Sequence, residues 1–205
     1  MKLMKNVILG ASLALSICAM TSAKAAVMLS FSPSSQVAST GDSVSLDLMI
    51  SGLTAGTADS LSTFDLDVIF DDSRLSLTSY LLTDLLGDSS AFEADDYSLG
   101  EYIPGLIGLS LLSYLDIDEL DNLQPSSFSL ATFNFDVISL ELGQATTVAI
   151  DTVFALGDAF GNALTIDSMG EGILRNPAEE VSTPASLGIF ILGVLLVMRR
   201  KYQLY

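Results

Sequence analysis

The chain has 205 residues, and its 25 acidic side chains outnumber its 8 basic ones, so the formal net charge is −17 at pH 7. It contains no histidine, and its only cysteine is Cys18. These counts exclude an imidazole base, a Ser-His triad and a His-based zinc site. The shortage of lysine and arginine also excludes a surface that could neutralise nucleic-acid phosphates.

The charges are separated along the chain. All 25 acidic residues lie between Asp42 and Glu180, where only Arg74 and Arg175 oppose them, so this region carries a net charge of −23. The other basic residues stand at the two ends, each group beside an apolar run. This layout predicts an acidic domain between two membrane-addressing signals.

The N-terminal segment has the three parts of an export signal. Lys2 and Lys5 precede the apolar run Val7–Met20, and small residues at Ala23 and Ala25 follow it. A basic start, an apolar run and an A-x-A site are typical of a cleaved secretory signal peptide, expected at residues 1–25. A permanent anchor would need a longer run, of about 20 apolar residues. Cleavage would remove the only cysteine, so no disulfide is expected in the exported protein.

Residues 26–173 show a two-residue alternation of apolar and polar side chains, as in Ser43–Ile50 and Ser62–Phe70. This period predicts strands with one buried and one solvated face. On the solvated face of Ser62–Phe70 we expect Asp65 and Asp67. The expected strands, in chain order, are Val27–Phe31, Ser43–Ile50, Ser62–Phe70, Leu75–Tyr80, Ile107–Leu115, Phe128–Val137, Thr146–Ala155 and Leu164–Ile173.

A short helix is expected at Asp118–Leu123, ended by Pro125. About eight short strands separated by turn residues are typical of an all-β sandwich, and antiparallel jelly-roll topology is the expected form. Leu61–Ile69 and Leu130–Ile138 share six identities in nine positions. We interpret both as central strands of one sandwich in the same apolar environment, with an internal repeat as the alternative.

Carboxylates gather at Asp116–Asp121, at Glu93–Asp96 and at Asp71 with Asp72. Calcium prefers several convergent oxygens, so a calcium site at one of these segments is an alternative to solvated turns. No other cofactor is expected. The chain has no tryptophan, so a sugar-stacking site would rest on tyrosines such as Tyr97 and Tyr102.

The central region resembles the cohesin domain. The resembling segments are Ser39-Thr-Gly-Asp42, the strand ending at Ser51-Gly52-Leu53, Phe64-Asp-Leu-Asp-Val-Ile-Phe-Asp71 with Arg74-Leu-Ser-Leu77, Ala131-Thr-Phe-Asn-Phe-Asp136 and Leu156–Leu164. The resemblance spans most of Ser34–Ile166. It implies a nine-stranded jelly roll related in fold to carbohydrate-binding modules, and a role in binding rather than catalysis. Cohesins bind dockerins, but no contact residue is carried over to this chain.

The C-terminal segment resembles the PEP-CTERM sorting signal of Gram-negative bacteria. Val181-Ser-Thr-Pro-Ala-Ser186 precedes an uninterrupted apolar run, Leu187–Met198, and the basic cluster Arg199, Arg200 and Lys201 closes it. The motif keeps Val181 and Pro184 but lacks the family's first proline and its glutamate. The resemblance implies processing by an exosortase, and the basic cluster predicts a cytoplasmic end. A simple membrane anchor is the alternative.

We therefore expect a signal peptide at residues 1–25, a cohesin-like β-sandwich at 26–173, a linker with the sorting motif at 174–186 and a transmembrane sorting helix at 187–201. The expected function is that of a non-enzymatic exported binding or structural protein with a protein or polysaccharide ligand, at the envelope or in the exopolysaccharide matrix. A carbohydrate-binding module for matrix glycans is the alternative. A glycosidase with two catalytic carboxylates is a more distant one.

Overall fold

The structure, a computed structural model, describes residues 26–54 and 60–178. Outside this range lie the expected signal peptide, the expected sorting motif and the apolar run Leu187–Met198. The residues expected to direct processing and sorting also lie outside it: Ala23, Ala25, Val181, Pro184, Arg199, Arg200 and Lys201. Within the described residues, no helix is long and apolar enough to cross a membrane.

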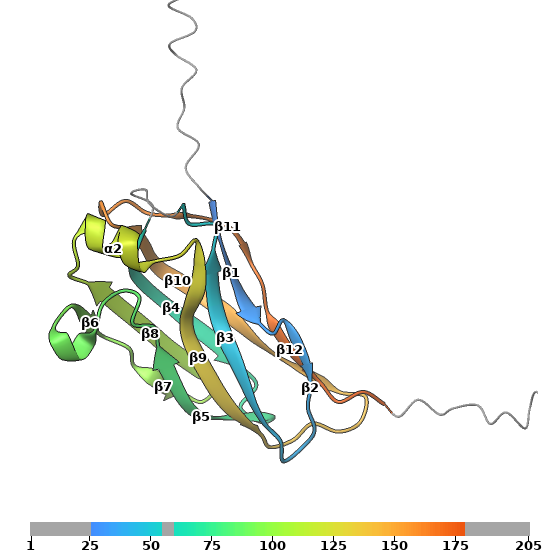
Figure 1. The fold of residues 1–205 in the computed structure, drawn as a ribbon. Helices are drawn as coiled ribbons and strands as arrows, with labels where there is room; N and C mark the ends of the chain where they lie inside the picture. Colours follow the sequence, from blue (N-terminus) through green and yellow to red (C-terminus); the bar gives the residue numbers. More distant parts are fainter. Residues whose placement is uncertain (1–25, 55–59, 179–205) are drawn as a thin grey trace, which may run out of the picture.

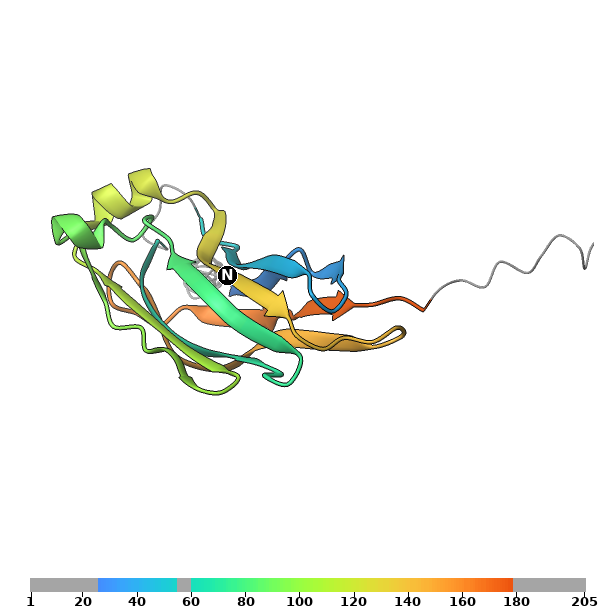
Figure 2. The same ribbon diagram turned by 90° about the horizontal axis from the view of Figure 1, so that it is seen from below.

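The described chain forms two β-sheets that pack face to face (Figures 1 and 2). The first sheet has the strand order β11-β1-β3-β9-β5. Its strands are β11 (Thr165–Met169), β1 (Ala26–Ser32), β3 (Ser43–Ser51), β9 (Ser127–Val137) and β5 (Leu75–Leu82).

The second sheet has the order β2-β12-β10-β4-β8-β6, and β7 also pairs with β8. Its strands are β2 (Ser35–Val37), β12 (Gly172–Arg175), β10 (Ala145–Asp158), β4 (Leu61–Phe70), β8 (Leu106–Ser113), β6 (Ala94–Asp96) and β7 (Gly100–Ile103). The two sheets and their antiparallel pairings confirm the expected all-β sandwich.

The alternating residues form the core as expected. On β3, Val44, Leu46, Leu48 and Ile50 are all buried between the sheets. Phe64, Leu66, Val68 and Phe70 face them from β4 of the second sheet, and Phe133, Phe135 and Val137 lie beside them on β9, in the same sheet as β3. Burying one such side chain contributes about 1.5–3 kcal/mol, so the core rather than any covalent link holds the sheets together.

The similar segments Leu61–Ile69 and Leu130–Ile138 lie on β4 and β9, which are interior strands of opposite sheets. Both therefore turn one face to the same core, which confirms our interpretation of them as central strands.

The segment expected as one strand at Leu164–Ile173 is two strands in different sheets. β11 pairs in parallel with β1, and β12 pairs with β10 in the other sheet. Gly170 lies between them, where its backbone N–H donates to the Leu29 carbonyl and the chain crosses from one sheet to the other. The last strand ends at Arg175, two residues past the expected domain boundary. Three short strands, β2, β6 and β7, were not expected from the alternation.

The expected helix is present as α2 (Ile117–Leu123), and a 3-10 turn, η1 (Ser89–Ala91), follows β5. Asp116 caps α2 by accepting from the Glu119 N–H, and the Glu119 side chain accepts from the Asp116 N–H. Two orphan donors at the helix start are thereby satisfied. Within the Asp116–Asp121 cluster, Asp116 and Glu119 therefore cap the N-terminus of α2.

Candidate functional site

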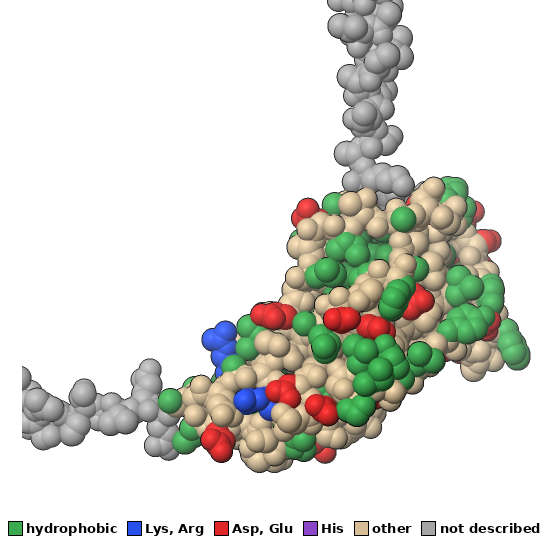
Figure 3. Space-filling model, turned by 180° about the vertical axis from the view of Figure 1, so that it is seen from behind, with side chains coloured by type: hydrophobic (Ala, Val, Ile, Leu, Met, Phe, Trp, Pro, Cys, Tyr) green, Lys and Arg blue, Asp and Glu red, His purple; other side chains and the backbone are tan. Residues whose placement is uncertain are grey.

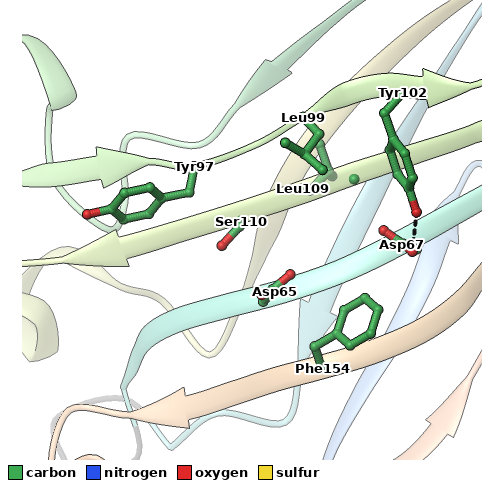
Figure 4. A pocket seen from close by; sticks show the side chains of 9 residues that line it. Asp65, Asp67, Tyr97, Leu99, Tyr102, Leu109, Ser110 and Phe154 are labelled. Carbon is green, nitrogen blue, oxygen red and sulfur yellow. Dashed lines mark hydrogen bonds between the residues drawn. The ribbon is translucent and has the colours of Figure 1, made fainter.

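The outer face of the second sheet carries a pocket of about 400 Å³. It lies over β8, β4 and β10, and Tyr97, Leu99 and Tyr102 wall it on one side (Figure 4). Asp65 and Asp67 line it from β4, and Phe154 from β10. Seen from this side of the molecule, hydrophobic side chains are gathered among carboxylates, and basic side chains appear only toward one end (Figure 3). The pocket therefore combines aromatic rings with negative charge.

Tyr102 reaches the pocket because of a tight hairpin between β7 and β8. Pro104 and Gly105 occupy its turn, and Gly105 has a φ of +80° that favours glycine. The turn brings β7 alongside β8, and Gly108 of β8 leaves room for the ring. A Cβ added at Gly108 would lie 3.2 Å from Tyr102 Cε1 and 3.4 Å from Leu99 Cβ. A side chain at position 108 would therefore push the pocket wall outward.

The Tyr102 hydroxyl donates a hydrogen bond of 2.8 Å to Asp67 Oδ2. The sequence predicted that Asp67 would be solvated, and this was wrong, because only 8% of the residue is exposed. The tyrosine ring covers the carboxylate that strand alternation directs outward. Alternation along a single strand cannot predict this contact, because the contact joins residues 35 positions apart.

The hydrogen bond to Asp67 is the largest cause that raises the pKa of Tyr102, followed by desolvation and then by the charges of Asp67 and Asp151. The folded pKa therefore exceeds the unfolded value of about 10. This contribution to stability is fully present below the unfolded pKa and is lost as the pH rises through the folded pKa.

Asp67→Asn is expected to lower the pKa of Tyr102 toward its ordinary value, because the amide removes the charge that disfavours the phenolate. Absorbance titration of tyrosinate measures this change. The Tyr102→Phe variant lacks the Tyr102 hydroxyl, so its titration curve shows which transition belongs to Tyr102. A titration curve that Asp67→Asn leaves unchanged would contradict the assigned contact.

Phe154 faces outward because β10 is irregular. Strict alternation would place it inward, in phase with Val148 and Leu156. The pairing of β10 with β4 shifts register between Ile150 and Thr152 and again between Val153 and Ala155. An extra residue at each shift re-aims the side chains that follow, and 64% of Phe154 is exposed. Sequence reasoning missed this residue because it assigned Thr146–Ala155 to a regular strand.

Tyr97 and Tyr114 extend the aromatic surface from the pocket toward β6. The hydroxyls of Tyr97 and Tyr114 both donate to Asp95 Oδ2, at 2.8 and 2.6 Å. The hydrogen bond from Tyr114, and then that from Tyr97, lower the pKa of Asp95, while the pKa of Tyr114 is raised chiefly by Asp95. A depressed carboxyl pKa stabilises the fold above the unfolded value, and this contribution is lost as the pH falls through the folded pKa. Tyr97 and Tyr102, which the sequence suggested as stacking residues, both line the pocket.

The acidic segments considered for calcium have local hydrogen-bonding roles. Asp71 Oδ1 accepts from the Ser73 N–H and hydroxyl, and Asp71 Oδ2 lies 3.1 Å from Arg74 Nε. Glu93 accepts from the Asp88 N–H, and Asp96 from the Ser98 N–H. In residues 26–54 and 60–178, no group of three or more acidic side chains is arranged to hold a metal ion.

The described residues hold 22 carboxylates against two arginines. Such a charge excess destabilises a compact state by self-repulsion. We expect the melting temperature to rise by a few degrees in moderate salt, since the Debye length falls to about 10 Å at 0.1 M. Calcium and magnesium at matched ionic strength should raise it equally, as measured by calorimetry. A clearly larger gain with calcium would reveal a specific site and contradict this expectation.

No protein-family model and no curated protein matches the chain. Solved structures do match its fold. CaCohA2 from Clostridium acetobutylicum has a TM-score of 0.58 at 19% identity, with 77% of this chain and 94% of that chain covered. The OlpA cohesin of a Clostridium thermocellum type I cohesin–dockerin complex has a TM-score of 0.57 at 12% identity, with 73% and 98% covered.

The cohesin module of a Clostridium perfringens family 33 glycoside hydrolase has a TM-score of 0.53 at 13% identity, with 76% of this chain and 98% of that chain covered. Each match spans nearly the whole of the other module. The described residues of this chain therefore have the cohesin fold.

Proposed function

We propose that this chain is a non-enzymatic binding module whose partner is a protein that docks on the outer face of β8, β4 and β10. The observation that carries the proposal is the pocket beneath Tyr102, with Phe154 exposed across it. Aromatic side chains that stand exposed around a pocket are the common anchors of protein interfaces. Strands hold these residues in place, so little conformational entropy is lost on binding.

The partner is expected to be basic where it meets this face. Asp65, Asp67 and Asp95 lie in or beside the aromatic surface, and Asp151 is close enough to affect Tyr102 electrostatically. Complementary charge steers association and suppresses wrong partners. Several of the similar structures, the OlpA structure among them, are described as cohesin–dockerin complexes. A module of the dockerin type is therefore the partner class that we propose.

The test is capture of a partner by the purified protein, identification of that partner by mass spectrometry and measurement of its affinity. Phe154→Ala combined with Tyr102→Ala should weaken the affinity at least about tenfold, as expected for anchor residues. Phe160→Ala is the matched control, because Phe160 is similarly exposed, at 59%, but lies in the turn after β10. Equal losses for the two variants, or no loss for the first, would overturn the proposed face.

A carbohydrate ligand is the second candidate. Tyr97, Tyr102 and Phe154 offer rings for stacking, and Asp65 offers oxygens that accept hydrogen bonds from sugar hydroxyls. A glycan array, followed by calorimetry with the sugars that bind, separates the two functions. Loss of sugar binding in Tyr102→Ala would establish the second, whereas an array without binding supports the first.

Catalysis by the pocket carboxylates is not proposed. A glycosidase needs two carboxyl groups that flank the scissile bond. Asp65 and Asp67 stand two residues apart on one strand and so occupy the same wall of the pocket. Asp67 is only 8% exposed and already accepts a hydrogen bond from the Tyr102 hydroxyl.

The proposed routing rests on the two terminal signals. We propose export after cleavage near Ala25, membrane retention by Leu187–Met198 with its basic cluster, and recognition of Val181–Ser186 by an exosortase-like enzyme. The cell surface or the exopolysaccharide matrix is the proposed destination. Mass spectrometry of the mature protein is the test. A C-terminus near Val181–Ser186 supports processing, whereas a chain ending at Tyr205 leaves the helix as a plain anchor.

A further inference from the structure

β5 is the outermost strand of the first sheet, and its outer edge is open. In Figure 2, which looks at the molecule from below, β5 (green) lies on the near side with β9 behind it. Among the described residues, the backbone of Ser76–Leu82 makes hydrogen bonds only with β9. The other side of the strand thus presents a row of unpaired N–H and C=O groups.

The composition of β5 is unusual for an exposed edge. Proteins protect such edges with lysine, other charges or proline, because a bare edge is a template for another strand. β5 reads Leu75-Ser-Leu-Thr-Ser-Tyr-Leu-Leu82 and contains neither a charge nor a proline. Leu81 is 72% exposed. β5 is therefore a neutral edge in a domain rich in charge.

A groove of about 390 Å³ runs beside this edge. Tyr80, Leu82 and Leu111 form its apolar lining, and Asp84, Asp88 and Asp96 stand around it. Partial burial and then the charge of Asp96 raise the pKa of Tyr80, which places that carboxylate within electrostatic reach of the ring. None of the residues that line the groove is basic.

We propose that β5 is a second interaction site, at which an extended, lysine- or arginine-bearing segment of a partner protein adds a strand to the sheet. Backbone pairing would satisfy the open edge, and the basic side chains would meet Asp84, Asp88 and Asp96. A second copy of this chain is a poor occupant, because two domains with this charge excess repel each other. The β5 edge belongs to the opposite sheet from the Tyr102 pocket, and the proposal does not depend on the function proposed for that pocket.

The probe is a synthetic nine-residue peptide of alternating lysine and valine, added to the purified full chain at physiological salt. Hydrogen exchange by NMR should show new protection of amides in Ser76–Leu82. The peptide should bind at least about tenfold more tightly than its glutamate–valine counterpart, because charge complementarity favours the basic sequence. The lysine peptide with every backbone amide methylated keeps the charge but cannot pair, and it should not protect the edge.

A charge-reversed pair of variants tests the position. Leu81→Lys should abolish binding of the lysine peptide, because it places a like charge on the edge, whereas Leu81→Glu should keep it. Leu81 is exposed, so both variants should melt like the parent protein. Asp84→Asn should weaken binding several-fold, since Asp84 lines the groove and its carboxylate makes no hydrogen bond within the described residues.

Several results would overturn the proposal. They are an absence of binding, equal binding of the methylated or glutamate peptide, and protection that maps to β4 and β10 instead of β5. A concentration-dependent dimer in sedimentation, with protected β5 amides and no peptide present, would replace the basic partner with a second copy of this chain.

Discussion

Replacing Phe135 with alanine is expected to lower the free energy of unfolding by about 3–5 kcal/mol. The residue has no exposed surface. Its ring meets that of Phe70 edge-on at a centroid distance of 5.0 Å, and it stacks near Phe133 at 6.1 Å. The substitution would leave a cavity at the junction of the two sheets, and the strand backbones that surround it cannot collapse to fill the space. Urea denaturation gives the change directly.

The matched control is the same substitution at Phe154, on the pocket face. Because 64% of Phe154 is exposed, Phe154→Ala should change the free energy of unfolding by no more than about 0.5 kcal/mol. The pair separates stability from binding, since only the second variant is expected to weaken the proposed partner interaction. A large stability loss at Phe154, or a small one at Phe135, would contradict the assignment of β9 to the core and of Phe154 to the surface.

Replacing Gln124 with leucine is expected to cost about 3 kcal/mol or more, because it leaves buried polar groups without partners. The Gln124 Oε1 accepts from the Leu61 N–H at 2.8 Å, and its Nε2 donates to the carbonyls of Leu61 and Leu85 at 2.7 and 3.0 Å. This one side chain joins the end of α2 to the start of β4 and to the loop after β5. Leucine has a similar volume and can satisfy none of the three groups.

Gln36→Leu is the control, since Gln36 makes a single exposed hydrogen bond, from Nε2 to the Ser45 carbonyl. It should change the free energy of unfolding by about 0.5 kcal/mol or less. Thermal unfolding of the two variants under the same conditions measures the difference. Similar melting temperatures for both would mean that the Gln124 network contributes little to stability.

The sequence alone determined the strands whose alternation is regular. Val44 to Ile50 and Phe64 to Phe70 are buried on the phase that their period predicts. The same reasoning located α2, because its polar start and the following Pro125 are local signals. Alternation depends only on residues that are neighbours in the chain, so it can be recognised in the sequence without any tertiary information. The short strands β2, β6 and β7 could not be predicted from alternation, because three or four residues are too few to show a period.

Only the tertiary structure decided the pocket. Phe154 points outward because β10 loses register against β4, and register is a property of two strands far apart in sequence. Asp67 is covered because a hairpin 35 residues away brings Tyr102 over it. Tyr97 and Tyr102 could be named from the sequence as exposed aromatics, but their common pocket could not. Strand faces follow from local periodicity, whereas a binding surface assembles side chains from several strands, and their relative positions are set by pairing and packing.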